Sequence, residues 1–265
     1  MTKIAFDIGG TNMRVAVADS EGLGEVMKIP TPQNPEEGIT AFAELAQKCA
    51  NGEKIEAVAG GFPGAVIEGT IQGSPNLPHW EGVHLAEKLK EALGASIMLE
   101  NDADIAALGE ATYGAGRGKR VVAYIGIGTG VGGGRVVDGK IDTGAYGLEP
   151  GHQIVDATGF GDLESFVSGR AFEKSYGVHP KDAPRQAYEM MTPILAVGLC
   201  NTILHWSPEV LILGGSMVVG VNCYTIPEIE DAFSRLPSVP RMPELKMAEL
   251  KDSAGLEGAR ALLSK

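Results

Sequence analysis

The 265-residue sequence predicts an α/β protein whose two domains share a cleft. Apolar strands alternate with amphipathic helices along most of the chain, which indicates a mixed α/β architecture. One pattern, a strand followed by a glycine-rich turn and a second strand, occurs twice, at the N-terminus and again in the middle. No low-complexity linker separates the two halves, so we expect the domains to contact each other and to exchange chain segments.

The composition predicts a soluble globular protein, because 44% of the residues are hydrophobic and can form sizeable cores. The 34 acidic residues and 22 Lys or Arg residues give a net charge of −12. This charge disfavours nucleic acid as a partner, since phosphate backbones attract basic proteins. An anionic nucleotide is still compatible, because backbone N–H groups and a metal ion can bind phosphate without a basic surface.

The three cysteines, Cys49, Cys200 and Cys223, are too few and too far apart to indicate a disulfide framework or a metal site. They favour a cytoplasmic location. The N-terminal "MTKIAFDIGG" interrupts its apolar run at Asp7, which predicts a first strand and excludes a signal peptide. The longest weakly polar run, residues 210–221, is too short to span a bilayer, so no membrane partner is expected.

The repeated pattern is "KIAFDIGGTNMRVAVADSEG" and "VVAYIGIGTGVGGGRVVDGK". A constant offset of 119 residues aligns Phe6 with Ile125 and Asp19 with Asp138, which predicts a diverged duplication of one hairpin. Glycines in both turns let backbone N–H groups approach a ligand closely. A strand follows each turn where a dinucleotide fingerprint would need a helix, and the sequence has no P-loop. Two such hairpins facing one nucleotide are typical of the actin-like, ribonuclease H-like ATPase fold.

The remaining elements follow the same alternation. Before the second hairpin we expect a helix at 35–50, a strand at 55–64, a helix at 83–94, a strand at 96–100 and a helix at 102–114. After it we expect a glycine-broken segment at 142–162, helices at 163–177 and 185–206, a strand at 209–218 and a C-terminal helix. We predict a small α/β domain at 1–110, joined by the C-terminal helix 251–265, and a larger α/β domain at 111–250.

The segment "LENDADIAALGE" places Asn101, Asp102 and Asp104 where a buried strand passes into a helix. Ligands of open α/β sheets bind at the carboxyl ends of strands. An Asp at this position is also a common helix cap, and for one acid taken alone capping is the more frequent role. Trp80, Trp206, Met190 and Met191 are expected in the core.

Several motifs together resemble the ROK group of sugar kinases and related repressors. "DIGGTN" is similar to its first phosphate motif, "LENDADIAALGE" to its catalytic segment and "GIGTGVGGG" to its second phosphate motif. "EPGH" is similar to its sugar motif and "LILGGSMV" to its adenosine-side motif. "SPNLPHWEGVHL" and "DSAGLEGA" also resemble family segments. The resemblance spans nearly the whole chain and implies an actin-like sugar kinase fold with an interdomain cleft.

The resemblance implies that ATP and Mg²⁺ are the cofactors. Asp102 would be the general base that accepts the proton of the sugar's primary hydroxyl, and Asn101 would bind a neighbouring hydroxyl. Asp7 would act on Mg²⁺, through water, while Asp104 remains a negative charge at a helix N-terminus. The nucleotide would contact the two phosphate turns and the adenosine-side motif, that is, Asp7, Gly9, Gly10, Thr11, Asn12, Gly128, Thr129, Gly130, Gly214 and Gly215.

On the sugar side, the resemblance assigns contacts to Gly64, Glu149, His152 and Glu164 as well as to Asn101 and Asp102. The carboxylates can accept hydrogen bonds from sugar hydroxyls, and the imidazole can donate or accept a hydrogen bond. Most of the group carries a zinc-binding cysteine cluster after this histidine. The segment here has no cysteine, so no zinc site is expected, as in the zinc-free glucokinase branch.

The resemblance therefore predicts phosphorylation of a hexose at the 6-hydroxyl, with glucose as the first choice. Fructose, mannose and N-acetylmannosamine are alternative substrates. A sugar-sensing regulator without catalysis is the alternative from another class, although retention of Asp102 favours an enzyme. The chain begins directly with its first strand, where repressor members carry a winged helix-turn-helix. A homodimer is compatible with the family.

Overall fold

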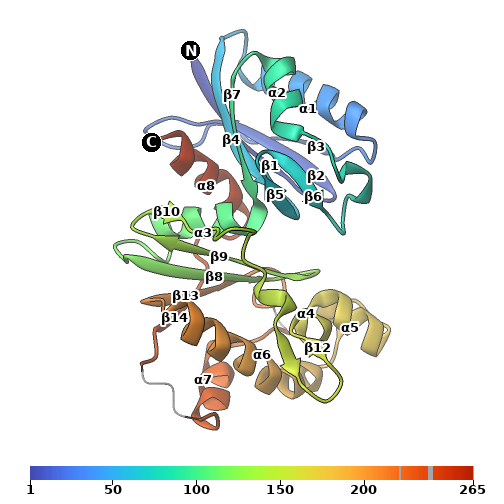
Figure 1. Ribbon diagram of the computed structural model, residues 1–265, viewed down its shortest axis with the longest axis vertical. Helices are drawn as coiled ribbons and strands as arrows, with labels where there is room; N and C mark the ends of the chain where they lie inside the picture. Colours follow the sequence, from blue (N-terminus) through green and yellow to red (C-terminus); the bar gives the residue numbers. More distant parts are fainter. Residues whose placement is uncertain (221, 238–240, 265) are drawn as a thin grey trace.

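The computed structural model describes residues 1–220, 222–237 and 241–264. It consists of two lobes, stacked one above the other in Figure 1, with two helices between them. Two of the predicted segments extend beyond this described part. Residue 221 is the last of the apolar run 210–221, and residue 265 is the last of the predicted C-terminal helix 251–265. The lobes can therefore be compared element by element over almost the whole chain.

The first lobe contains the N-terminal hairpin and the elements that lead to the catalytic segment. Its strands are β1 (Thr2–Ile8), β2 (Asn12–Val17), β3 (Met27–Pro30), β4 (Ile55–Phe62), β5 (Ala65–Ile67), β6 (Thr70–Gly73) and β7 (Ser96–Asn101). Its helices are α1 (Pro35–Cys49), the 3-10 helix η1 (Pro78–Trp80) and α2 (Leu85–Leu93), and α3 (Asp102–Thr112) follows β7. The side chain of Asn34 caps α1 and Pro35 occupies its first turn, which explains where this helix begins.

The second lobe contains the repeated hairpin and the sugar-motif segment. Its strands are β8 (Val121–Ile127), β9 (Val131–Val137), β10 (Lys140–Ile141), β11 (Ile154–Asp156), β12 (Gly161–Asp162), β13 (Val210–Gly214) and β14 (Glu244–Met247). Its helices are η2 (Pro150–His152), α4 (Glu164–Val167), α5 (Gly169–Tyr176), η3 (Pro180–Asp182), α6 (Arg185–Trp206) and α7 (Ile226–Ser234). The chain ends with η4 (Lys251–Ser253) and α8 (Ala254–Leu263).

The two main sheets follow one plan. Their strand orders are β3-β2-β1-β4-β7 and β10-β9-β8-β13-β14. In each sheet the central strand is antiparallel to its hairpin partner and parallel to the next strand. This agreement extends the duplication inferred from the hairpins to five strands per lobe.

The constant offset holds only for the first strand of each hairpin. Ile8 pairs with Met13, whereas Ile127, its counterpart at an offset of 119, pairs with Val131. The second turn is therefore one residue shorter, and the offset becomes 118 beyond it. The predicted match of Asp19 with Asp138 is wrong by one position, because sequence alignment without a gap cannot detect a shortened turn.

Each sheet is covered on one face by the helix that follows the last strand of the other sheet. α3 leaves β7 of the first sheet but packs on β8 and β9, with Ala107 and Leu108 beside Val122 and Val136. α8 leaves β14 of the second sheet but packs on β1 and β4. The two helices also pack on each other, and they occupy the layer between the lobes in Figure 1. The opposite sheet faces carry α1 and α2 in the first lobe and α6 and α7 in the second.

Two glycines allow this close helix pair. A Cβ on Gly258 of α8 would lie 1.8 Å from the carbonyl oxygen of Ile105, and a Cβ on Gly109 of α3 would lie 2.4 Å from that of Ala254. Real Cβ atoms do not approach so closely, so each position requires glycine. The catalytic segment is thus fixed against the C-terminal helix by backbone contact.

α6 is the one described helix that is long and apolar enough to span a bilayer, with a mean hydropathy of 1.3. In the structure 56% of that stretch is buried, and Leu195, Leu199 and Ile203 belong to the second lobe's core. A core helix passes the same test, so this is weak evidence for a membrane span. Met190, expected in the core, lies on the exposed face of α6 and is 58% exposed.

Candidate functional site

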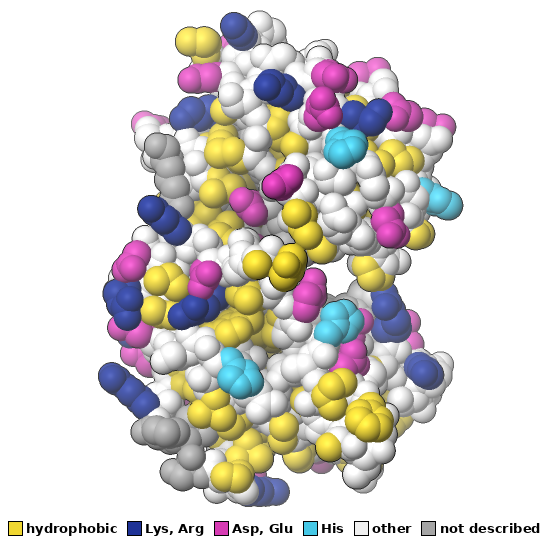
Figure 2. All heavy atoms as spheres, in the orientation of Figure 1, with side chains coloured by type: hydrophobic (Ala, Val, Ile, Leu, Met, Phe, Trp, Pro, Cys, Tyr) yellow, Lys and Arg dark blue, Asp and Glu magenta, His cyan; other side chains and the backbone are white. Residues whose placement is uncertain are grey.

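The predicted site residues lie at corresponding ends of the two sheets. In the first sheet, Asp7 pairs with Gly61, and Gly61 pairs in turn with Glu100, so the carboxyl ends of three parallel strands meet beside α3. In the second sheet, Gly126 pairs with Gly214 at the matching ends of β8 and β13. Ligands of α/β sheets bind at such strand ends. Figure 2 shows a notch between the lobes on one side of the molecule.

The N-terminus of α3 is capped by Asn101. The neighbouring acids Glu100 and Asp102 do not cap it. Asn101 Oδ1 accepts hydrogen bonds from the backbone N–H groups of Ala103 at 2.8 Å and Asp104 at 3.2 Å. Its Nδ2 donates to the carbonyl oxygen of Gly64 at 2.9 Å. The φ of Gly64 is +118°, a conformation that favours glycine, so this loop is tied to the start of α3 in a specific shape. Because the cap is occupied, Asp102 is available for other chemistry.

Asp102 is the first residue of α3 and lies close to other acids. Burial, and after it the charge of Asp7, raises the pKa of Asp102 to about 7. A carboxylate with a pKa near the working pH can accept a proton in the reaction and is still ionised in much of the population. The environment of Asp102 therefore suits a general base.

Asp104 differs from the expected charge at a helix N-terminus. It is only 4% exposed, and burial followed by the charges of Glu100 and Asp102 raises its pKa to about 8. Its Oδ1 has no hydrogen-bond partner among the described residues and lies beside Gly134 of β9. The side chain is thus mostly protonated at neutral pH. The sequence could not show this, because the burial comes from the second lobe.

Arg14 holds Asp7 in place and was not among the predicted site residues. Its Nε donates to Asp7 Oδ2 at 3.1 Å, and its Nη2 makes a second, short hydrogen bond to the same oxygen. Its Nη1 donates to the carbonyl oxygen of Asp252 at 2.8 Å. Gly255 faces the Asp7 carboxyl, and a Cβ there would lie 3.3 Å from Asp7 Cγ. The C-terminal segment thus completes the surroundings of the predicted metal-side acid.

The first phosphate turn is closed by hydrogen bonds within the first lobe. Gly9 N–H donates to Asn12 O at 2.8 Å, and the Thr31 hydroxyl donates to Gly9 O at 2.6 Å. Thr31 N–H also donates to Thr11 O at 3.0 Å. A Cβ on Gly10 would lie 2.9 Å from Cβ of Asn76 in the "SPNLPHW" segment. This contact brings that segment to the turn, although sequence analysis gave Asn76 no role.

The second phosphate turn is held by the helices that follow the sugar motif. Gly128 N–H donates to Gly130 O at 2.9 Å, and the backbone N–H groups of Gly169 and Arg170 donate to the carbonyl oxygens of Gly128 and Thr129. These N–H groups are available because the predicted helix at 163–177 is broken at Ser168. The extended backbone and the hydroxyl cap of Ser168 start α5 anew, directly beside the turn.

Glu164, a predicted sugar contact, joins the sugar segment to this same turn. Its Oε2 accepts a hydrogen bond from Val131 N–H at 2.7 Å, and a Cβ on Gly130 would lie 2.5 Å from that oxygen. Its Oε1 lies 3.8 Å from Nη1 of Arg170. Glu164 therefore stands between a backbone donor and a cation, and Arg170 supplies a positive charge at the turn.

The predicted sugar histidine is oriented by Asp162. His152 Nδ1 and Asp162 Oδ2 are 2.9 Å apart, and this hydrogen bond raises the pKa of His152. Because Asp162 occupies Nδ1, the Nε2 atom on the other side of the ring is the nitrogen left for a ligand. Partial burial raises the pKa of Glu149, while the positive charge of His152 opposes this shift. Asp162 was not among the predicted site residues.

A small hairpin orders the sugar-motif segment. β11 and β12 pair antiparallel, and Asp156 closes the turn between them by accepting hydrogen bonds from Thr158 and Gly159. Gln153 Nε2 donates to Pro150 O at 2.7 Å and secures the preceding turn. Within the part of the chain that the structure describes, no group of three His, Cys, Asp or Glu residues could hold a metal ion.

Gly214 and Gly215 pack tightly against the second sheet. A Cβ on Gly214 would lie 2.4 Å from the Tyr124 hydroxyl, and one on Gly215, whose φ is +89°, would lie 2.3 Å from Ile127 O. These contacts alone account for both glycines. A nucleotide contact at this position remains a prediction from the resemblance.

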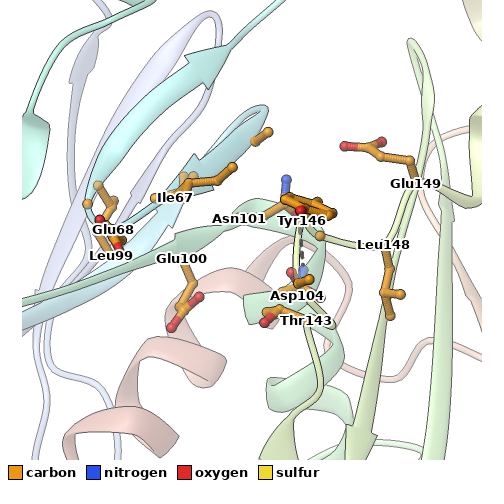
Figure 3. A pocket seen from close by; sticks show the side chains of 15 residues that line it. Ile67, Glu68, Leu99, Glu100, Asn101, Asp104, Thr143, Tyr146, Leu148 and Glu149 are labelled. Atoms are coloured by element: carbon orange, nitrogen blue, oxygen red, sulfur yellow. Dashed lines mark hydrogen bonds between the residues drawn. The ribbon is translucent and has the colours of Figure 1, made fainter.

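A cavity of about 320 Å³ lies beside the start of α3. Figure 3 shows its lining, with Asn101 and Glu149 among the labelled side chains. Asp102, His152 and Glu164 are not among its lining residues. The cavity therefore extends away from the predicted base and adjoins only two of the predicted sugar contacts. Its lining residues are Ala65, Val66, Ile67, Glu68, Gly69, Leu99, Glu100, Asn101, Asp104, Thr143, Ala145, Tyr146, Gly147, Leu148 and Glu149.

Comparisons with known proteins identify the family of the chain and several of its relatives. The sequence model of the ROK family matches residues 3–265. A glucokinase from Thermotoga maritima is 29% identical, with 98% of this chain and 96% of that protein covered. An N-acetyl-D-glucosamine kinase from Citrobacter koseri is 31% identical, with 97% of each chain covered.

Solved structures show the same architecture. The ROK hexokinase from Thermus thermophilus superimposes with a TM-score of 0.84 at 29% identity, covering 100% of this chain and 99% of that one. A ROK family glucokinase from Streptomyces griseus, solved in complex with glucose and AMPPNP, gives a TM-score of 0.78 at 27% identity, covering 99% of each chain. The predicted two-domain, actin-like sugar kinase fold is confirmed.

Proposed function

Since the chain belongs to the ROK family, we propose that it is an ATP- and Mg²⁺-dependent hexose kinase that phosphorylates the 6-hydroxyl, most readily that of glucose. The observation that carries this proposal is the state of Asp102. Asn101 caps the N-terminus of α3, which leaves the carboxylate of Asp102 free of the capping role. Asp102 lies next to the carboxyl ends of the strands, and burial raises its pKa to about 7. A sensor would need the sugar contacts but no such base.

In the reaction, Asp102 accepts the proton of the 6-hydroxyl as that oxygen attacks the γ-phosphorus, the bond from this phosphorus to the bridging oxygen breaks, and ADP leaves. A positioned general base contributes roughly 10²- to 10⁴-fold to such a rate. The remaining acceleration comes from alignment and from neutralisation of phosphate charge, which Mg²⁺ supplies when it is bound. Asp7, fixed by two hydrogen bonds from Arg14, would hold that ion through water.

The two glycine turns fit phosphate groups. A Cβ on Gly9 would meet only Asn12 O, at 3.4 Å, and one on Gly128 would meet only Ser216 Oγ, at 3.8 Å. Both turns thus border open space, where backbone N–H groups can bind phosphate oxygens. Arg170, next to the second turn, offers a charge that lowers the cost of bringing a polyphosphate into an acidic cleft.

The sugar contacts come from both lobes. Gly64 and Asn101 belong to the first lobe, while Glu149, His152 and Glu164 belong to the second. A ring of hydroxyls can satisfy carboxylate acceptors and an imidazole at the same time. Binding therefore requires both lobes, and the hexose lies between Asp102 and the sugar segment.

A second candidate substrate class is the N-acetylhexosamines, because several relatives, including those from Pectobacterium atrosepticum and Citrobacter koseri, are N-acetyl-D-glucosamine kinases. A coupled assay for ADP release over glucose, fructose, mannose, N-acetylglucosamine and N-acetylmannosamine separates these possibilities. We expect glucose to give the highest kcat/KM. Two outcomes would contradict the kinase proposal: ADP release at the same rate with and without sugar, or no ADP release with any of the five sugars.

A further inference from the structure

The cavity beside α3 contains a polar group that the proposed reaction does not use. Asp104 lines the cavity, is 4% exposed, and has an Oδ1 without a hydrogen-bond partner among the described residues. A buried polar atom without a partner is costly and is usually paired by the protein, by water or by a ligand. The unpaired Oδ1 lies beside Gly134 of β9, and the rest of the Asp104 side chain contributes to the wall of this cavity.

The cavity wall combines apolar and acidic surfaces. Figure 3 shows Ile67 and Glu68 at one end, Leu148 and Glu149 at the other, and Asp104 between them. The aliphatic part of the wall consists of Ala65, Val66, Ile67, Leu99, Ala145 and Leu148. The acidic part consists of Glu68, Glu100, Asp104 and Glu149.

Tyr146 adds an exposed aromatic ring to this wall. It is 82% exposed although it belongs to the cavity lining. Gly144 and Gly147, with φ of +60° and +91°, flank it and shape the loop that presents the ring. An aromatic side chain that packing does not bury is available to a ligand.

These surfaces select the chemical class of the ligand. Carboxyl groups repel anions, which excludes phosphorylated or carboxylated groups. A metal ion is disfavoured, since no described group of three His, Cys, Asp or Glu residues could hold one. A purely cationic ligand would leave the aliphatic part of the wall without a role. A sugar ring has hydroxyls for the acids and C–H faces for Tyr146 and Leu148, so it matches both surfaces.

The neighbouring site determines how that ring is attached. This step rests on the proposed function, in which Asp102 binds the 6-hydroxyl and Asn101 binds a hydroxyl next to it. The ring hydroxyl closest to C6 is the 4-hydroxyl. Asn101 lines the cavity but Asp102 does not, so the cavity begins where the 4-hydroxyl would lie and extends away from the reacting oxygen.

We propose that this cavity is a second sugar subsite, which accepts an uncharged glycosyl group on O4 of the hexose that is phosphorylated. Its volume of about 320 Å³ is at the lower end of the range for small-molecule sites and suits one additional ring. The chain then accepts 4-O-glycosylated glucose in addition to glucose.

Calorimetric titration without nucleotide tests the subsite independently of catalysis. The probes are glucose, the 4-O-linked isomers maltose and cellobiose, and trehalose, an isomer in which the rings are joined through their anomeric carbons. We expect at least one 4-O-linked isomer to bind, and trehalose not to bind. If no sugar is phosphorylated in the coupled assay, the kinase proposal fails, but the titration still decides the subsite.

Two variants locate the second ring. Tyr146→Ala and Glu68→Gln should each raise the ratio of the disaccharide Kd to the glucose Kd by about 3- to 10-fold, as expected for loss of one aromatic or polar contact. Met190→Ala on α6 and Glu37→Gln on α1 are matched controls, because both side chains are exposed and lie outside the cavity. Their ratios should not change. The proposal is overturned if maltose and cellobiose both fail to bind where glucose saturates, if trehalose binds equally well, or if the ratio is unaffected in both cavity variants.

Discussion

Asn101 and Asp102 are adjacent polar residues with separate tasks. The amide of Asn101 makes three hydrogen bonds, to two helix N–H groups and to the Gly64 carbonyl. Asp102 keeps its carboxylate for the reaction. A single acid at this junction could not both cap the helix and remain a free base, because the cap hydrogen bonds would stabilise its ionised form and lower its pKa.

The first prediction concerns Asp102→Asn. The amide keeps the shape of the carboxylate but cannot accept the hydroxyl proton, so kcat should fall by roughly 10²- to 10⁴-fold. Sugar affinity should fall only modestly, because the amide can still hydrogen-bond a hydroxyl. Steady-state kinetics and calorimetric binding of glucose measure the two quantities. Turnover close to that of the unmodified protein would remove Asp102 from its proposed role.

The second prediction concerns the pH dependence of stability through Asp104. Its pKa is about 8 in the folded protein and near 3.8 when unfolded, so the folded state binds the proton more tightly. Its contribution to stability is therefore complete below pH 4 and is lost as the pH rises to 8. Asp104→Asn resembles the protonated acid at every pH. Compared with the unmodified protein, its Tm should be higher at pH 8, and this difference should be clearly smaller at pH 5. An equal Tm difference at both values would show that Asp104 does not titrate in this range.

Helix packing explains why the catalytic segment is rigid. α3 and α8 approach until the Cα of Gly258 lies against the carbonyl oxygen of Ile105, with Gly109 allowing the matching contact. Two sets of contacts therefore fix α3, whose first residue is Asp102. One is its packing against α8, and the other is the hydrogen bond between Asn101 and Gly64 at its N-terminus.

The third prediction concerns Gly258→Ala. The new methyl group would lie 1.8 Å from a backbone oxygen, so the two helices must separate. Overpacking of this kind lowers the free energy of unfolding by about 1–3 kcal/mol. Denaturant unfolding measures the change. Gly73→Ala is the control, since its Cβ would meet no atom within 4 Å. Equal stabilities of the two variants would show that the helices can separate without cost.

The fourth prediction concerns metal in the sugar segment. The hairpin of β11 and β12, with its Asp156 turn, orders this segment through hydrogen bonds alone. Purified protein should contain no stoichiometric zinc, and a chelator should not change the Tm of the ligand-free protein. Chelation should stop turnover, and excess Mg²⁺ should restore it. A drop in Tm on chelation would reveal a structural metal, because its binding energy is folding energy.

The long elements could be predicted from the sequence, and the short ones could not. The helices α1, α2, α3, α6 and α8 and the strands β1, β4, β7, β8 and β13 lie where apolar periodicity placed them. β3 and β14 have four residues each, none of them fully buried, and depend on pairing with a neighbouring strand. The break at Ser168 was also missed, since a helical pattern continues through it. Its reason is tertiary: it lets α5 begin beside the second phosphate turn.

The candidate site shows the same limit. Motifs identify Asp7, Asp102 and His152, but the residues that hold them, Arg14 and Asp162, are visible only after folding. Motifs record which residues a ligand requires. The supporting contacts depend on which strands and loops become neighbours, which the motifs themselves do not show.

At the scale of the whole molecule, the two lobes carry different parts of the proposed chemistry. The metal-side acid and the base belong to the first lobe, and the sugar contacts Glu149, His152 and Glu164 belong to the second. Binding and turnover should therefore respond to different substitutions, although a single cleft is involved.

The fifth prediction is this partition. Glu149→Gln, His152→Ala and Glu164→Gln should mainly raise the KM for sugar, because each removes a hydroxyl contact. Asp7→Ala should mainly lower kcat and raise the Mg²⁺ concentration required for half-maximal rate. Titrations of sugar and of Mg²⁺ on the four variants measure both effects. The opposite partition would mean that the two sides of the cleft are misassigned.

The exchange of α3 and α8 between the sheets has a consequence for biosynthesis. During translation, β1 and β4 leave the ribosome long before α8, yet Ala5 and Ala59 of these strands are covered by Leu256 and Ala259 of α8. The first sheet thus keeps an uncovered apolar face until α8 has been made. A nascent chain that stalls after β13 should therefore be recognised by chaperones or degraded. In this protein, synthesis of α8 is the step that allows the first lobe to finish folding.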